Sequence, residues 1–178
     1  QKGTISLNET VLDWENQEYK TRIGYLPEFP FYYPHLSVME MMRLTGGLRR
    51  VPKELLEERI HYLLERFDLH SYRNLSMDEL SQGTKKRVAL SSTLLHKPDI
   101  LILDEPTNGL DPDQVIIVRD TLREYSEQGG LVLLSTHILG LAEKLADHVG
   151  IVRSGRLLFA GEPSGDLESL YLAHRLEA

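Results

Sequence analysis

Two carboxylates follow one of the most apolar stretches of the chain. Residues 100–103 are four aliphatic residues in a row, and Asp104 and Glu105 come directly after them. This run predicts a strand buried on both faces, and Pro106 ends its hydrogen-bonded ladder. Ligands of open α/β sheets bind at such strand ends, where an aspartate can hold Mg²⁺ and a glutamate can deprotonate water. On its own, the string fits a solvated acidic turn equally well.

A second apolar strand leads to a histidine. Residues 131–134 are wholly aliphatic, and Ser135, Thr136 and His137 follow them. The helix predicted between the two strands implies a parallel pair with a right-handed crossover. We therefore expect His137 to lie at the same sheet edge as the carboxylates, where it can contact a phosphate oxygen. A lone histidine at a strand end is more often structural, but the neighbouring carboxylates favour a functional role.

A third polar group opens a predicted helix. Ser81, Gln82 and Gly83 stand at the start of a helix expected from residue 84 to residue 95. A hydroxyl and bare backbone N–H groups at the positive end of a helix dipole favour an anion, although a serine N-cap alone is the simpler interpretation. The basic residues 85–87 predict a mixed face, with some side chains solvated and others paired with acids.

The size and charge of the chain exclude several classes of protein. Its 178 residues are enough for one domain with a sizeable core. The formal charge of −7 argues against an electrostatic nucleic-acid binder. The lack of cysteine excludes disulfides and thiolate metal sites. No apolar run has membrane-spanning length and no signal peptide opens the chain, so we expect any membrane role to come through a partner.

The remaining pattern alternates between strands and helices. Residues 35–97 are mostly helical, and the segments on either side are rich in strands, which predicts a helical insert in an α/β body. Gly46-Gly47 is expected to end the first helix of the insert. Residues 9–20 read as a loop, and the chain from about Gly161 reads as a loosely attached tail.

Taken together, the motifs resemble the nucleotide-binding subunit of an ABC transporter of the exporter type. Each motif is weak alone, but the order and spacing match from about residue 3 to residue 162. The matching segments are residues 26–28 (Q-loop), 80–84 (signature, usually LSGGQ), 100–105 (Walker B), 109–111 (D-loop), 137 (switch histidine) and 150–161 (the hairpin after the switch).

The resemblance implies the fold of a P-loop NTPase of the RecA-like type. This fold is α/β, with a mostly parallel sheet and an inserted helical subdomain. It divides the chain into residues 1–34 (first strands and Q-loop of the ATPase core), 35–97 (helical subdomain with the signature), 98–162 (Walker B, D-loop, switch and hairpin) and 163–178 (a carboxyl-terminal tail).

The resemblance also implies a role for each candidate residue, with ATP and Mg²⁺ as the bound species. Glu105 is the expected catalytic carboxylate, and His137 is the expected sensor of the γ-phosphate. Asp104 is expected to hold the metal, with help from Glu28. The residues expected to contact nucleotide or the dimer interface are Ser81, Gln82, Gly83, Asp111 and Glu28.

Three departures from the family pattern matter. Glu28 replaces the usual glutamine, and an ionised glutamate cannot donate a hydrogen bond. Gln82 and Thr84 alter the signature. The chain also contains no G-x-x-x-x-G-K-[ST] sequence, whose backbone N–H groups and lysine cradle phosphates. We therefore expect the chain to be a fragment that lacks its P-loop region. Such a fragment exposes apolar edges and hydrolyses ATP negligibly by itself.

The expected partners are a second nucleotide-binding subunit, identical or different, and an integral membrane permease that contacts residues 28–40. The aromatic stretch 29–33 fits either core packing or this docking. The subunit is expected to be cytoplasmic and peripheral on the membrane, and no nucleic-acid partner is expected.

One alternative function is that of a non-catalytic partner that supplies only the signature to a complete subunit. Another is a soluble ABC-type ATPase acting in translation or DNA repair.

Overall fold

A computed structural model describes residues 3–7, 9–13, 15, 18–163 and 166–175. The alternating residues 5–8 predict a short strand, and its last residue, Asn8, lies outside these ranges. The elements are β1 (Ser6–Leu7), β2 (Thr10–Val11), the 3₁₀ helix η1 (Glu18–Thr21), β3 (Ile23–Leu26), α1 (Val38–Leu48), α2 (Lys53–Arg66), η2 (His70–Tyr72), η3 (Met77–Glu79), α3 (Gln82–Leu94), β4 (Ile100–Asp104), α4 (Pro112–Glu127), β5 (Leu131–Ser135), α5 (Leu139–Leu145), β6 (Val149–Arg153), β7 (Arg156–Gly161) and α6 (Leu167–Arg175).

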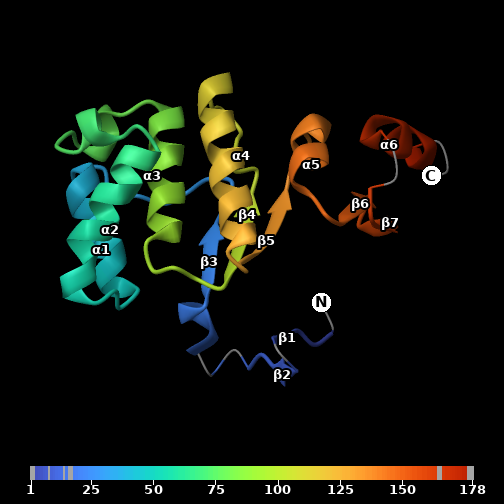
Figure 1. The fold of residues 1–178 in the computed structure, drawn as a ribbon, viewed down its shortest axis with the longest axis horizontal. Helices are drawn as coiled ribbons and strands as arrows, with labels where there is room; N and C mark the ends of the chain where they lie inside the picture. The colour runs from blue at the N-terminus through green and yellow to red at the C-terminus, as the bar shows by residue number, and fades with distance from the viewer. Residues whose placement is uncertain (1–2, 8, 14, 16–17, 164–165, 176–178) are drawn as a thin grey trace.

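A parallel sheet of three strands lies at the centre of the molecule, in the order β3-β4-β5 (Figure 1). β4 pairs with both neighbours, and α4 forms the crossover from β4 to β5. The predicted parallel pair and the α/β class are confirmed. Two antiparallel hairpins, β1–β2 and β6–β7, flank the sheet, and β6–β7 is the hairpin predicted over residues 150–161.

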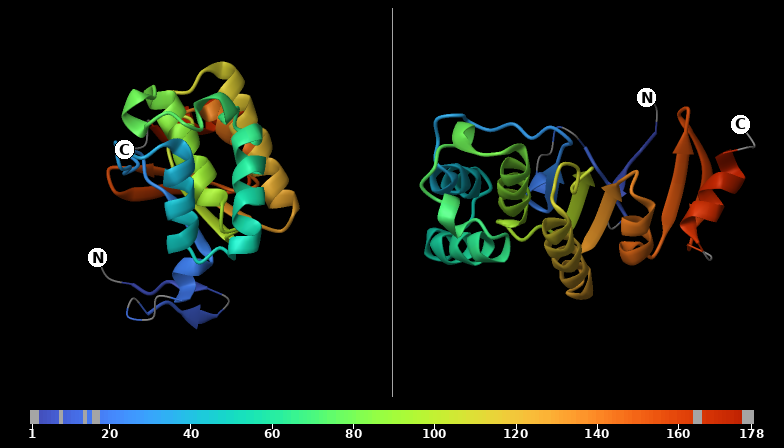
Figure 2. Two further views of the ribbon diagram at one scale, coloured as in Figure 1. Left: turned by 90° about the vertical axis from the view of Figure 1, so that its left-hand side faces the viewer. Right: turned by 90° about the horizontal axis from the view of Figure 1, so that it is seen from above.

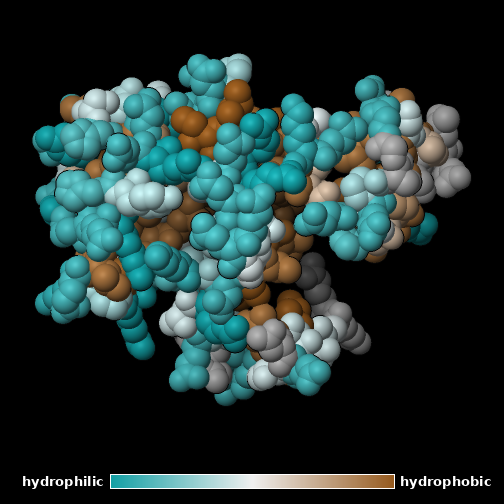
Figure 3. All heavy atoms as spheres, viewed as in Figure 1, coloured by the Kyte–Doolittle hydropathy of each residue, from teal (hydrophilic) through white to brown (hydrophobic). Residues whose placement is uncertain are grey.

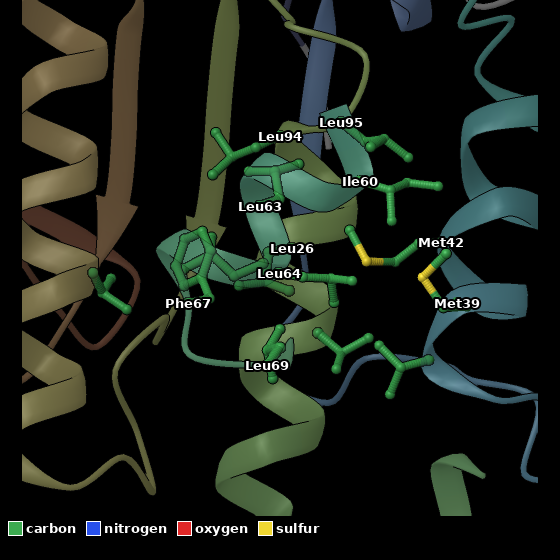
Figure 4. Packing of buried hydrophobic residues seen from close by; sticks show 14 of the residues in the cluster. Leu26, Met39, Met42, Ile60, Leu63, Leu64, Phe67, Leu69, Leu94 and Leu95 are labelled. Atoms are coloured by element: carbon green, nitrogen blue, oxygen red, sulfur yellow. The ribbon is translucent and has the colours of Figure 1, made fainter. Parts of the chain in front are cut away.

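Helices α1 to α3 lie between β3 and β4 in sequence and form one helical layer with its own core. Their apolar residues recur at helical spacing and meet in the middle, where Phe67 lies beside Leu26 and Leu64, and Met39 and Met42 of α1 face α2 (Figure 4). Ser37 caps α1 in a full capping box with Glu40. The division into domains at residues 34, 97 and 162 stays a prediction.

The central sheet is covered on one face only. Leu26, Leu101 and Leu103 are buried under the helices, whereas Leu131 and Leu133 are 58% and 61% exposed. Seen from above, α4 and α5 lie on one side of the strands, and no described helix covers the other side (Figure 2). The side that carries α4 is mostly hydrophilic (Figure 3). The prediction that these strands are buried on both faces is therefore wrong for the described chain.

Two predicted boundaries are also wrong. Helix α1 passes through Gly46-Gly47 and ends at Leu48. Gly46 allows close packing rather than ending the helix, because a Cβ there would lie 2.3 Å from the Leu56 side chain. Residues 9–20 contain β2 and most of η1 rather than a plain loop.

The segment after Gly161 is attached rather than loose over its described part. Helix α6 contacts α5. Leu167 is 4% exposed, and its backbone N–H donates to the Glu143 carboxylate at 2.8 Å. Within the described residues, no helix has both the length and the apolar character needed to cross a membrane.

The one-sided core predicts unequal effects of two leucine substitutions. Leu101→Ala is expected to lower the free energy of unfolding by about 2–5 kcal/mol, because its side chain is fully buried. Leu133→Ala is expected to change it by about 0.5 kcal/mol or less, because that side chain is mostly exposed. Urea denaturation measures both values. Equal losses would show that both faces of the sheet are covered in solution.

Candidate functional site

Polar residues from three strands meet at one edge of the sheet. Because β3, β4 and β5 are parallel, their carboxyl ends lie together. Glu28 follows β3, Asp104 ends β4 with Glu105 directly after it, and His137 follows β5. The structure thus brings the predicted carboxylates and the predicted histidine to one place.

Glu105 and His137 form a direct pair. The distance from His137 Nδ1 to Glu105 Oε1 is 2.9 Å. The Glu105 side chain is 18% exposed and that of His137 is 70% exposed. The second carboxylate oxygen of Glu105, Oε2, is buried and has no hydrogen-bond partner in the described structure. A buried carboxylate oxygen without a partner is costly, so this atom is a natural position for a water molecule.

A buried lysine lies beside these acids. Lys86 is 5% exposed, and its ammonium group donates to the backbone carbonyl of Glu28 at 2.6 Å. Burial lowers the pKa of Lys86, while the charges of Glu28, Asp104 and Glu105 oppose this shift. The sequence did not single out this residue.

Arg87, the next residue, is also buried. It is 7% exposed and donates to the carbonyl oxygens of Phe67 and Asp68 at the end of α2, at 2.7 and 2.9 Å. The predicted pairing with acids holds for Arg87, whose guanidinium lies 3.9 Å from the Asp68 carboxylate, although Lys86 and Arg87 are both buried rather than on a surface face. The ammonium group of Lys86 and the guanidinium group of Arg87 donate mainly to backbone carbonyls, a pairing that residue types alone do not reveal.

The signature segment forms the first turn of α3. Ser81 is the N-cap, and its hydroxyl accepts from the Thr84 backbone N–H at 3.1 Å. Thr84 is buried at 4% exposure and its hydroxyl contacts the Ser81 hydroxyl at 2.8 Å, so it supports Ser81 from inside. Ser81 and Gln82 are exposed. The structure thus leaves these two side chains accessible to a ligand or a partner.

Gly83 lets the signature segment pack closely against the segment after Glu105. A Cβ at Gly83 would lie 3.0 Å from the backbone oxygen of Gly109, so a larger residue would push the two segments apart. Asp111 follows as the exposed N-cap residue of α4, and its side chain makes no capping hydrogen bond. Asp111 thus lies two residues after the Gly109 that Gly83 contacts, and its carboxylate is exposed.

The residues present fit Mg²⁺ only as part of a larger site. In the described portion of the chain, no three His, Asp or Glu side chains gather closely enough to hold a metal ion. Mg²⁺ in nucleotide sites usually takes one or two carboxylates, with phosphates and water supplying the other ligands. Asp104, at the strand end, fits that limited role, and Glu28 follows the neighbouring strand.

A cleft of about 260 Å³ lies between α1, α3 and the loop after β3. Phe31, Tyr32 and Met41 are among its lining residues. Phe29 and Phe31 are 83% and 76% exposed, so core packing does not explain them. Tyr32 does pack against the core, and the ammonium group of Lys85 lies 5.0 Å from the centre of its ring.

The fold and these motifs agree with comparisons to known proteins. The family model described as "ABC transporter" matches residues 1–108, which is more than half of the chain. The chain belongs to the ABC transporter family. The resemblance seen in the motif order is thus confirmed, and with it the P-loop NTPase fold class.

Individual relatives of this ABC protein share about a third of its residues. The Nod factor export ATP-binding protein I of Cupriavidus metallidurans is 31% identical over 167 residues, which are 94% of this chain and 55% of that protein. The ABC transporter ATP-binding protein YxlF of Bacillus subtilis is 38% identical over 161 residues, 90% and 52% of the two chains. This ABC protein therefore spans about half the length of these curated relatives.

A solved structure titled "Structure of ATP binding subunit of ABC transporter" has a similar fold. Its TM-score is 0.83 and its sequence identity is 29%, over 89% of this chain and 70% of that chain. The similarity extends over the helical layer and the central sheet together, because it covers nearly the whole ABC chain.

The N-cap at Ser81 gives a testable contribution to the stability of this ABC protein. Ser81→Ala is expected to lower the free energy of unfolding by about 0.5–2 kcal/mol, because the first turn of α3 loses its side-chain acceptor. Ser81→Gly is the matched control and is expected to cost only a few tenths of a kcal/mol, about 0.3. Urea denaturation compares the variants. An alanine variant as stable as the native chain would mean that Ser81 does not cap α3.

Proposed function

We propose that this chain carries the water-activating part of an ATP-hydrolysing site that powers a membrane transporter. Membership of the ABC transporter family supports an ATP-dependent transport role. The observation that carries the proposal is the contact between Glu105 and His137, with the second Glu105 oxygen buried and unpaired. The subunit acts from the cytoplasmic face of the membrane, bound to a separate membrane-spanning subunit.

In this proposal, Glu105 is the general base and its unpaired oxygen receives the proton of the attacking water. The water oxygen bonds to the terminal phosphorus of ATP, the bond from that phosphorus to the bridging oxygen breaks, and ADP leaves. His137 holds the other Glu105 oxygen at 2.9 Å and orients the carboxylate toward the water. Its exposed ring is free to contact the terminal phosphate.

Asp104 and Glu28 are the proposed metal ligands, directly or through water. A bound Mg²⁺ neutralises developing charge on the phosphate oxygens. Lys86 keeps the loop after β3 in place by its bond to the Glu28 carbonyl, so the Glu28 side chain stays near the sheet edge. These assignments use oxygen donors only, which are the donors that Mg²⁺ prefers.

The phosphate cradle must come from another segment or subunit, because the sequence contains no P-loop motif. The open face of the sheet supports this proposal. Leu131 and Leu133 are exposed there, and Asp104 shares their face, because side chains alternate along paired strands. A covering element that bears the cradle would bury these leucines and bring phosphate-binding groups next to Asp104.

The exposed signature turn supports a second nucleotide-binding subunit as the partner. Ser81, Gln82 and Gly83 offer a hydroxyl and backbone N–H groups at the positive end of α3, which suits the γ-phosphate of ATP held by that subunit. Asp111 joins the same interface. If the chain never binds ATP itself, these residues still allow the alternative role of a non-catalytic partner that completes another subunit's site.

The cleft beside α1 is the proposed docking site for the membrane subunit. Within residues 28–40, Pro30, Phe31 and Tyr32 line it, and the exposed aromatic rings of Phe31 and of nearby Phe29 suit an apolar helix. Export is the proposed direction, because several similar proteins are named Nod factor export ATP-binding protein I.

Calorimetry with Mg-ATP tests the hydrolytic role. The 178-residue chain alone is expected to give a Kd above about 1 mM and negligible turnover, because most phosphate contacts are missing. Addition of a nucleotide-binding subunit with a P-loop is expected to restore hydrolysis. Glu105→Gln in this chain is expected to abolish the ATP hydrolysis that takes place at the site containing Glu105. Turnover near ~1 s⁻¹ by the chain alone would contradict the proposal.

Alanine at Phe31 tests the docking site. Phe31→Ala is expected to weaken association with the membrane subunit by about tenfold or more, because an exposed aromatic anchor is lost. Its free energy of unfolding is expected to change by about 0.5 kcal/mol or less. Co-purification in detergent measures association. The control Tyr62→Ala removes another largely exposed aromatic ring, from α2, where 62% of the residue is exposed against 76% for Phe31. Equal binding by both variants would exclude the cleft.

A further inference from the structure

Ser135 is the last residue of β5 and lies opposite Asp104 in the parallel register. Its hydroxyl donates a hydrogen bond to Asp104 Oδ1. The two residues are 31 positions apart in sequence, and only the pairing of β4 with β5 brings them together. Among the described residues, Ser135 is the side chain that fixes one oxygen of the Asp104 carboxylate.

The same serine also contacts Glu105. The backbone N–H of Glu105 donates to the Ser135 carbonyl at 3.2 Å and to the Ser135 hydroxyl oxygen at 3.3 Å. Glu105 has a φ of 44°, in the left-handed region that costs a non-glycine residue about 1–2 kcal/mol. The bonds to Ser135 are therefore interactions that compensate for an unfavourable backbone conformation.

The left-handed residue separates the two neighbouring carboxylates. Asp104 turns toward β5 and Ser135, whereas Glu105 reaches His137. A serine hydroxyl can donate one hydrogen bond and accept others at once, so one group can hold both residues. An alanine at this position would keep the backbone carbonyl but would lose the bond to Asp104.

We propose that Ser135 is a positioning residue that fixes Asp104 and Glu105 in the separate directions that metal binding and water activation require. This inference rests on the proposed function for its purpose, but the geometry can be tested without ATP. Ser135 acts through the two carboxylates and has no contact with the reacting atoms in this assignment. Because Ser135 is exposed on the open face, its hydroxyl adds little to core packing.

The test uses the isotopically labelled 178-residue chain in solution. Three-bond NMR couplings to the Asp104 carboxyl carbon report its χ1 angle, and the amide exchange rate of Glu105 reports its backbone bond. The native chain and Ser135→Thr are expected to show one Asp104 rotamer. Ser135→Ala is expected to show averaged rotamers and amide exchange about tenfold faster at Glu105. Thr136→Ala is the control, because its hydroxyl contacts only Ile138 in the described structure.

Each outcome decides the assignment. Averaged couplings in Ser135→Ala, rescued by Ser135→Thr and absent from Thr136→Ala, support it. A single unchanged rotamer in Ser135→Ala would overturn it, and so would a loss of folding in Ser135→Ala that threonine does not rescue. The Mg-ATP calorimetry stands apart from this test. Failure of ATP hydrolysis with rotamers as expected would refute the proposed function and leave the positioning geometry intact.

Discussion

The pairing of β4 with a parallel strand on each side is the constraint on which the rest of the structure depends. This pairing places the carboxyl ends of three strands at one edge, although their residues are spread over more than a hundred positions of the chain. It sets Asp104 opposite Ser135 and puts Glu105 within reach of His137. A shift of one residue in register would turn Asp104 to the helical side of the sheet and separate these contacts.

Helix α3 connects the helical layer to this edge. Arg87 satisfies two carbonyl groups at the end of α2, and Lys86 satisfies the carbonyl of Glu28 after β3. Both cations are buried, so loss of these carbonyl contacts would leave charged groups poorly satisfied in a region of low polarity. The signature turn at Ser81 is thereby fixed to the sheet edge through the next turn of its own helix, which bonds the loop after β3.

The two faces of the sheet have different roles. One face is buried under the helices and stabilises the fold. The other carries exposed leucines and also bears Asp104 and Ser135 at its polar end. Exposed apolar side chains next to Asp104, the proposed metal ligand, suit a covering element that also supplies phosphate contacts. This arrangement explains why strands with a fully apolar sequence are only half-buried in the described chain.

The sequence by itself determined the elements and their order, because aliphatic strands, capped helices and turn residues act locally. It also determined the family and brought Asp104, Glu105 and His137 into one expected site through the strand–helix–strand rule. Only the tertiary structure decided the roles of Ser135 and Lys86, whose partners lie 31 and 58 residues away. It alone showed the left-handed Glu105 and the open sheet face. Register, burial and backbone hydrogen bonds depend on distant segments, and a single sequence carries no local signal for them.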